Sequence, residues 1–143
     1  MSDEVTAALR VRMAGGDGHY GGGLVDGAHI LRLFGDLATE ITIRLDGDEG
    51  LLSHYREVTF LAPVRAGDYV EAVARLTRRT RLRRFVEFEA RKVIAARYDL
   101  GPSAAEPLEP PVVVCRAHGI TVRPRVVARD RLAGVHTNGS ESR

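Results

Sequence analysis

At 143 residues, with 44% apolar residues and a formal net charge of +2, the chain has the size of a single domain, residues 1–143, that can bury a core without disulfides or a metal. The small net charge excludes a bulk electrostatic signature of nucleic-acid binding, although the pI of about 9.0 reflects local arginine clusters. The chain has a single cysteine, its N-terminus lacks a basic and apolar leader, and no apolar run approaches the ~20 residues of a membrane span. These features predict a cytoplasmic protein that binds neither nucleic acid nor membrane.

The first half of the chain predicts a strand, a loop and a helix. Apolar and basic residues alternate over residues 9–13, which is typical of a short, half-buried strand. Six glycines in residues 14–23 predict a loop whose backbone can approach a ligand closely. Residues 24–45 predict a helix, because apolar side chains recur at helical spacing at Ile30, Phe34, Leu37 and Ile41.

The second half of the chain predicts strands. Asp46, Asp48 and Glu49 in residues 46–50 are expected to cap and end the helix, with attraction of a substrate ammonium from a partner subunit as the alternative. Apolar and polar residues then alternate in three segments, at 58–62, 70–77 and 86–91. Four prolines predict a loop over residues 99–111, residues 112–124 predict a last strand, and the polar residues 136–143 predict a tail that is flexible or docked on a neighbouring subunit.

This order of elements predicts an α+β domain in which a five-stranded antiparallel sheet wraps around one long central helix. Short turns between successive strands favour antiparallel pairing, and the helix is the one element available to cover a face of the sheet. Such a sheet leaves an edge strand exposed, which favours a homodimer formed through edge pairing.

Several motifs resemble a known family over residues 8–98. The segment "GHYGGGLVDGA" before the helix and the residues Phe60, Pro63, Gly67 and Asp68 in "FLAPVRAGD" resemble the hotdog fold of acyl-CoA thioesterases and dehydratases. The segments "HYGGGLVDGA", "FGDLATE" and "DGDEGL" are similar, more specifically, to the β-aminoacyl-CoA ammonia lyases. The chain departs from that family's motif at Gly23, where the family carries asparagine, which bears on substrate specificity more than on reaction class.

The resemblance implies a lyase that reversibly eliminates ammonia from a short β-aminoacyl-CoA, with 3-aminobutyryl-CoA and crotonyl-CoA, as in lysine fermentation, as the expected pair. It implies no metal or redox cofactor, because coenzyme A arrives as part of the substrate, and a homodimer or a trimer of dimers. One alternative is an acyl-CoA thioesterase on the same fold. Another is a non-catalytic acyl-CoA-binding or assembly protein, because fold alone does not establish chemistry.

Elimination of this kind requires hydrogen-bond donors for the thioester oxygen, where the charge of the α-carbanion collects. Backbone N–H groups at a helix start supply such donors. We expect them at the glycine loop and the first helical turn, from Gly22, Gly23, Val25 and Gly27. The alternative is that the glycines only form a flexible turn.

The reaction also requires a carboxylate base and a negative group near the ammonium of the substrate. On a helical wheel, one stripe beside the apolar face holds Asp26, His29, Leu33, Asp36 and Glu40. The carboxylates of Asp36 and Glu40 are four residues apart and repel when both are ionised, which favours a proton on one of them. We expect Asp36 to be the base, with Glu40 and Asp26 as further catalytic candidates. The alternatives are a salt-bridged helix flank for Asp36 and Glu40, and an acid that complements the helix dipole for Asp26.

Other candidate residues lie in the loop and in a basic cluster. His19 and Tyr20 are expected to donate to the thioester or to shape the pocket, with ordinary loop packing as the alternative for the histidine. The phosphates of CoA suit guanidinium groups, and the predicted turn after residue 77 carries Arg78, Arg79, Arg81, Arg83 and Arg84. The alternative is a solubilising turn. The five histidines show no metal-ligand spacing, so no metal site is expected.

Overall fold

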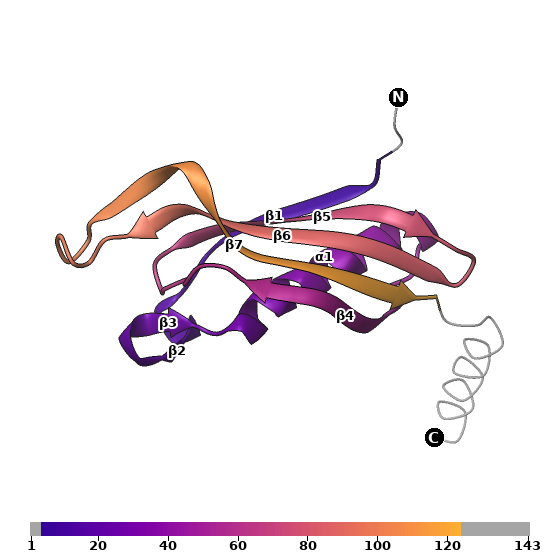
Figure 1. Cartoon of the computed structure of the whole chain (residues 1–143), viewed down its shortest axis with the longest axis horizontal. Helices are drawn as coiled ribbons and strands as arrows, with labels where there is room; N and C mark the ends of the chain where they lie inside the picture. The colour runs from indigo at the N-terminus through magenta and orange to yellow at the C-terminus, as the bar shows by residue number, and fades with distance from the viewer. Residues whose placement is uncertain (1–3, 124–143) are drawn as a thin grey trace, which may run out of the picture.

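A five-stranded antiparallel sheet wraps around a single long helix in the computed structural model, which describes residues 4–123 (Figure 1). The strands follow the order β1-β5-β6-β7-β4, and a second sheet pairs β2 with β3. The predicted architecture is therefore confirmed, and the predicted tail at residues 136–143 lies outside the described residues. The elements are β1 (Thr6–Arg12), β2 (Gly18–Tyr20), β3 (Leu24–Val25), α1 (Gly27–Asp46), β4 (Leu51–Phe60), β5 (Tyr69–Arg79), β6 (Arg83–Ala96) and β7 (Ala105–Val122).

The helix starts later than the apolar pattern predicts. Leu24 and Val25 form β3 instead of a first helical turn, because the Val25 N–H donates to the Val64 carbonyl at 2.8 Å. Asp26 is the N-cap residue, and α1 ends at Asp46, where the C-cap Gly47 adopts φ +65° and donates its N–H to the Ile43 carbonyl at 2.8 Å. The helix therefore ends close to the predicted position, and the backbone of Gly47, instead of an acidic side chain, makes the capping hydrogen bond.

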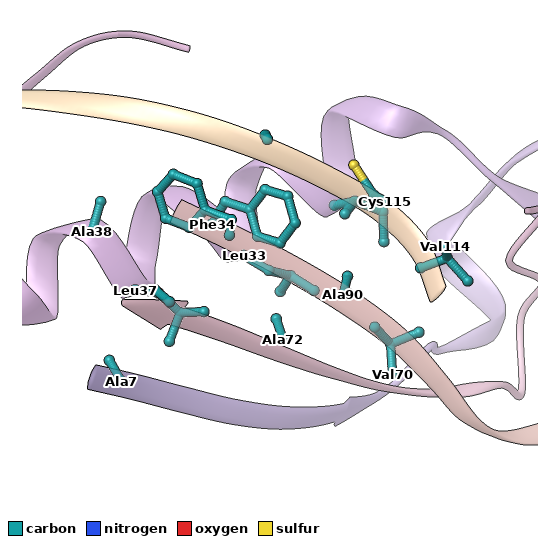
Figure 2. Packing of buried hydrophobic residues seen from close by; sticks show 14 of the residues in the cluster. Ala7, Leu33, Phe34, Leu37, Ala38, Val70, Ala72, Ala90, Val114 and Cys115 are labelled. Carbon is teal, nitrogen blue, oxygen red and sulfur yellow. The ribbon is translucent and has the colours of Figure 1, made fainter. Parts of the chain in front are cut away.

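The core lies between one face of α1 and the concave face of the sheet (Figure 2). The Phe34 ring from the helix stacks on Phe88 of β6, with ring centroids 4.9 Å apart and an angle of 12° between the planes. Around this pair the buried side chains of β5 and the first part of β6 alternate along the strand, as on any half-buried sheet. The core also includes Leu37 and Ile41 from α1, Val70 and Ala72 from β5, and the consecutive residues Val114 and Cys115 from β7.

The prolines after residue 100 do not form the predicted loop. The turn is confined to residues 97–104, and β7 begins at Ala105 and runs through Pro107, Pro110 and Pro111. In this part of β7 one edge pairs with β6, and the other has no partner within residues 4–123 because β4 pairs only from Cys115 onward. Proline is tolerated on such an edge, and the pairing with β6 also skips residues between Lys92 and Ile94.

The other strands are longer than the alternating segments predict. β4 begins at Leu51 instead of residue 58, and β6 extends past residue 91 to Ala96 as one side of an arm that projects beyond the sheet (Figure 1). Side-chain alternation marks only those parts of a strand that have one buried face. The start of β4 and the end of β6 carry few buried side chains, so apolar and polar residues do not alternate there.

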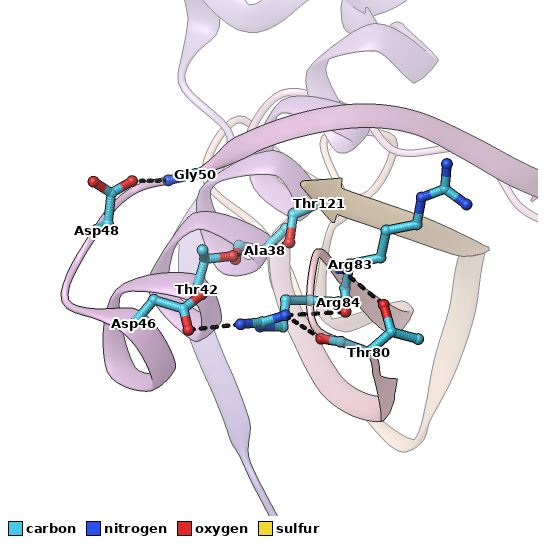
Figure 3. Close-up of polar contacts among 9 residues, drawn as sticks. All are labelled: Ala38, Thr42, Asp46, Asp48, Gly50, Thr80, Arg83, Arg84 and Thr121. Carbon is cyan, nitrogen blue, oxygen red and sulfur yellow. Dashed lines mark hydrogen bonds and ion pairs between the residues drawn. The ribbon is translucent and has the colours of Figure 1, made fainter. Parts of the chain in front are cut away.

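The far end of the helix is joined to the β5–β6 turn by a buried ion pair (Figure 3). The Arg84 guanidinium lies 2.7 Å from Asp46 Oδ1, and the two side chains are only 3% and 6% exposed. Arg84 also donates to the Thr80 carbonyl at 2.8 Å, while the Thr42 and Thr121 hydroxyls meet at 3.0 Å beside it. Arg84 therefore serves the fold, and its predicted role as a phosphate ligand is wrong because its charge is buried against Asp46.

Candidate functional site

A cavity of about 480 Å³ opens at the start of α1. Most of its wall is apolar, from residues of β3, α1 and the segment after β4. Its polar groups are the Tyr20 hydroxyl and the Asp26 carboxylate, and the latter makes no capping hydrogen bond to its own helix. The cavity therefore offers an apolar slot with one carboxylate, which suits a short acyl chain that carries an amino group.

Only some of the N–H groups predicted as oxyanion donors lack an acceptor in the part of the chain that the structure describes. The Val25 N–H is used by the Val64 carbonyl, so Val25 is not a free donor and that assignment is wrong. The N–H groups of Gly27 and Ala28 open the helix, and within residues 4–123 neither finds an acceptor. The donors that remain at the cavity are those of the first helical turn, where the helix dipole favours negative charge.

Gly27 permits a close approach of an aromatic ring to the helix start. A Cβ at this position would lie 2.4 Å from Cζ of Phe60, the last residue of β4. The Phe60 ring is 54% exposed and forms one wall of the cavity. The sequence predicts Phe60 as part of an alternating strand and of the family motif, and its place over the helix start could not be inferred from spacing.

Gly27→Ala is expected to lower catalytic turnover about tenfold or more, with a much smaller change in stability. The added methyl must displace the Phe60 ring, and because the ring is half exposed it can swing outward at little cost, which changes the cavity wall and the access to the N–H groups. Initial rates and thermal unfolding of the variant test this, with Arg32→Ala at an exposed position of the same helix as a control. Full activity in Gly27→Ala would contradict the role of this wall.

The two central glycines of the loop lie at a different cavity. Gly22 and Gly23 both adopt φ +73°, a conformation that favours glycine, and they line a second hollow together with Arg65 and Lys92. His19 packs edge-on against Tyr20 at a centroid distance of 4.8 Å on the exposed loop. The loop is thus more than a flexible turn, since it separates two cavities.

The predicted acids of the helix flank do not share the first cavity within one chain. Asp36 lies ten residues after Asp26, which is about 15 Å along the axis at 1.5 Å per residue. Its side chain is exposed and has no ion-pair partner among residues 4–123. Glu40 lies 2.8 Å from Arg44, as in the salt-bridged interpretation. The catalytic roles of Asp26, Asp36 and Glu40 stay predictions, and a shared site needs a second subunit.

Tyr55 is the neighbour of Asp36 that sequence analysis missed. Its hydroxyl donates to the Leu31 carbonyl, and a Cβ at Gly35 would lie 3.4 Å from that oxygen. Burial, then the Asp36 carboxylate, then Cys115 raise the pKa of Tyr55 to about 12. The tyrosine is therefore a neutral donor beside Asp36 at physiological pH, and no spacing in the sequence links β4 to this turn of α1.

Above pH 9 the fold is expected to lose stability. Burial raises the pKa of the Cys115 thiol from 9.0 to about 11, and that of Tyr55 rises from 10.0 to about 12. Both groups keep their protons in the fold where the unfolded chain has lost them, so the stabilisation is complete below about pH 9 and declines as the pH rises to about 12. Urea midpoints at pH 8 and pH 11 test this, and Cys115→Ala should show a smaller decline than the wild type. Equal declines would contradict the contribution of the thiol.

The arginine turn lies far from the helix start. The glycine loop contacts the chain just before β5, and Arg78 and Arg79 end that 11-residue strand, which spans about 35 Å at ~3.3 Å per residue (Figure 1). Arg78 is placed over the Phe85 ring at 4.7 Å. Arg81 and Arg83 are exposed at the turn. One chain therefore cannot join these arginines and the helix start in one small site.

Comparison with known proteins identifies the family. The thioesterase superfamily model matches residues 22–93. A 3-aminobutyryl-CoA ammonia lyase of Acetoanaerobium sticklandii is 54% identical over 119 residues, which are 83% of this chain and 94% of that protein. The chain belongs to the ammonia lyase family of the thioesterase superfamily. The resemblance noted in the sequence is thereby confirmed.

Solved structures agree with this assignment. The β-alanyl-CoA:ammonia lyase of Clostridium propionicum superposes with a TM-score of 0.79 at 32% identity, covering 82% of this chain and 84% of its own. A hexameric hotdog fold thioesterase of Campylobacter jejuni gives 0.67 at 16% identity, covering 82% and 81%, which shows the hotdog fold alone.

Two further properties hold for the part of the chain that the structure describes. None of its helices is long and apolar enough to cross a membrane. Across residues 4–123, no three His, Cys, Asp or Glu side chains are grouped to hold a metal ion.

Proposed function

We propose that the protein is a carbon–nitrogen lyase that reversibly eliminates ammonia from a short β-aminoacyl-CoA, with 3-aminobutyryl-CoA and crotonyl-CoA as the preferred pair. The observation that carries this is the 54% identity with a 3-aminobutyryl-CoA ammonia lyase over 94% of its length. The cavity at the helix start supports it, because it joins an apolar wall, free N–H donors and one carboxylate.

The proposed mechanism places the thioester oxygen at the N–H groups of Gly27 and Ala28. There the developing charge of the α-carbanion meets donors that are already oriented. A carboxylate, for which Asp36 is favoured, takes the α-proton, and the electrons of the C–N bond leave with ammonia as the double bond forms. Asp26, which lines the cavity, holds the ammonium of the substrate in this proposal, and the proton that the base releases converts the leaving ammonia to ammonium ion. No metal or redox cofactor enters these steps, since CoA is carried by the substrate.

This mechanism requires two subunits in one site. Among residues 4–123, β4 is an edge strand with no partner on its outer side, and it carries exposed apolar side chains at Leu51, Leu52 and Phe60. We propose a homodimer through this edge, which would bring the exposed Asp36 of one chain toward the helix start of the other. A trimer of dimers is the larger assembly, in line with the hexameric hotdog thioesterase of similar fold.

The reaction is placed in the cytoplasm, where the single cysteine needs no partner.

Absorbance of the enoyl thioester tests the proposal directly. Purified protein with crotonyl-CoA and ammonium should consume the enoyl signal in proportion to ammonium, without release of free thiol. Thiol release would instead identify a thioesterase of the same superfamily. Silence in both assays, together with tight binding of CoA, would identify an acyl-CoA-binding or assembly protein. Either of these outcomes overturns the lyase assignment.

A further inference from the structure

A second cavity, of about 540 Å³, lies on the other side of a narrow ridge from the helix-start cavity. The ridge is formed by residues 23–25 and 64–66, which pair through the bridge between Leu24 and Arg65. The Val25 N–H donates to the Val64 carbonyl, and the Ala66 N–H donates to the Gly23 carbonyl, each at 2.8 Å. Because the ridge is two segments wide, a long ligand seated in the first cavity can cross it into the second.

Two cations with free donors face this second cavity. Arg65 is exposed, and no side chain in residues 4–123 pairs with its guanidinium. Lys92 is the only lysine of the chain, its side chain is 13% exposed, and its Nζ lies 3.4 Å from Asp68 Oδ2. An ammonium carries three N–H donors, so this ion pair leaves donors for a ligand.

The carboxylate beside Lys92 is already used by the fold. Asp68 is 2% exposed, and its two oxygens accept the Ala96 N–H and the Arg65 N–H, both at 2.8 Å. These bonds hold the backbone of Arg65 against the strand that carries Lys92. The aspartate therefore positions the two cations and does not cancel the charge of Arg65.

The third cation of the cavity is occupied. Arg97 makes two hydrogen bonds to Asp99, at 2.8 and 3.0 Å, and one to Glu106 at 2.8 Å. The lining carries three cations, Arg65, Lys92 and Arg97, against Asp68 and Asp99, and Glu106 behind Arg97 brings the formal balance to zero, so the attraction for an anion comes from the free donors of Arg65 and Lys92. An anionic ligand is favoured there, and its contacts fall to Arg65 and Lys92.

We propose that this second cavity binds a phosphate group of the CoA thioester, with Arg65 and Lys92 as its cationic contacts. The glycine loop fits this use, because a Cβ at Gly22 would meet no atom within 4 Å and the backbone is open to a ligand there. The assignment rests on the proposed function, and it moves the phosphate from the arginine turn to the loop beside the acyl cavity. The diphosphate and the 3′-phosphate of CoA share this chemistry.

Calorimetric titration with CoA tests the site without turnover. Arg65→Ala should weaken CoA binding about 10- to 100-fold, the effect expected for loss of a charged hydrogen bond, with an unchanged unfolding temperature. Arg83→Ala, an exposed arginine of the distant turn, is the matched control and should leave binding unchanged. Lys92→Gln should weaken binding in the same direction, and the Arg65 variant keeps the test valid where the lysine variant is unstable.

Truncated ligands separate the remaining interpretations. The acyl-pantetheine thioester lacks the nucleotide phosphates, so its KM should be the same for the wild type and Arg65→Ala. Dephospho-CoA should keep the effect of the substitution where Arg65 contacts the diphosphate, and lose it where the contact is the 3′-phosphate. The proposal is overturned by a variant that binds CoA as tightly as the wild type, or by one that loses the pantetheine thioester equally. A wild-type protein that does not bind CoA at all would overturn the proposed function as well.

Discussion

Arg84→Ala is expected to lower the free energy of unfolding by about 3–5 kcal/mol, the range for breaking one side of a buried ion pair. The substitution leaves the Asp46 carboxylate buried at 6% exposure without its cation. Asp46 Oδ2 already lacks a hydrogen-bond partner, so no other donor in residues 4–123 is in place to replace the guanidinium. The loss should also free the end of α1 from the β5–β6 turn. Urea unfolding followed by circular dichroism measures it as a shift in midpoint.

Two companion variants isolate the cause. Arg83→Ala removes an exposed guanidinium from the same turn and should change stability by no more than about 0.5 kcal/mol. The double variant Arg84→Met with Asp46→Leu removes both charges and should recover most of the loss, because an apolar pair of similar size avoids the desolvation penalty. A double variant as unstable as Arg84→Ala would show that packing of the arginine, and not its charge, holds this end of the helix.

The elements that bury one regular face were predictable from the sequence. The spacing of Ile30, Phe34, Leu37 and Ile41 identifies α1, and all four side chains are buried against the sheet. The alternation in β5 and β6 identifies their central parts for the same reason. The fold class follows from these patterns, because one amphipathic helix and several half-buried strands have few ways to share a core.

The features that depend on long-range pairing were not predictable. The prolines of β7 read as a loop because the sequence does not tell which strand edge is left unpaired at residues 105–113. Arg84 reads as an exposed member of a basic run, since its partner Asp46 lies 38 residues away. Similarly, Val25 reads as a helical donor until the Val64 carbonyl is placed beside it.

The sequence indicated which residue types line the candidate site, but not that the structure separates them into two cavities. The glycine loop and the helix start both line cavities, but the sequence places Gly22 and Gly27 in one cavity and the structure places them in two. Lys92 carried a signal that composition analysis could have used, because a lone lysine among twenty arginines is unusual. Its pairing with Asp68 appears only when β6 lies beside the β4–β5 connection.

Asp36→Asn is expected to lower kcat for ammonia elimination about 10²- to 10⁴-fold, the range for loss of a general base. The substitution keeps the size of the side chain, and because Asp36 is exposed and unpaired in residues 4–123 the fold should be unaffected. KM should change little if the residue acts on the proton alone. Glu87→Gln, which alters an exposed acid of β6 in a salt bridge with Arg75, is the control and should retain full activity. Full turnover in Asp36→Asn would remove this residue as the base and leave the reaction class in place.

Mixing two inactive variants tests whether the site is shared between subunits. Asp26 and Asp36 are about 15 Å apart along one helix, so the mechanism needs Asp26 from one chain and Asp36 from the other. In a dimer of Asp26→Asn and Asp36→Asn chains, one site carries both substitutions and the other carries neither. Random exchange of equal amounts should therefore restore about a quarter of the wild-type rate, since half of the dimers have one intact site of two. A shared site predicts one fully unsubstituted site in every mixed dimer. If activity does not recover although subunits have exchanged, both carboxylates belong to the site of a single chain, or one of them has no part in catalysis.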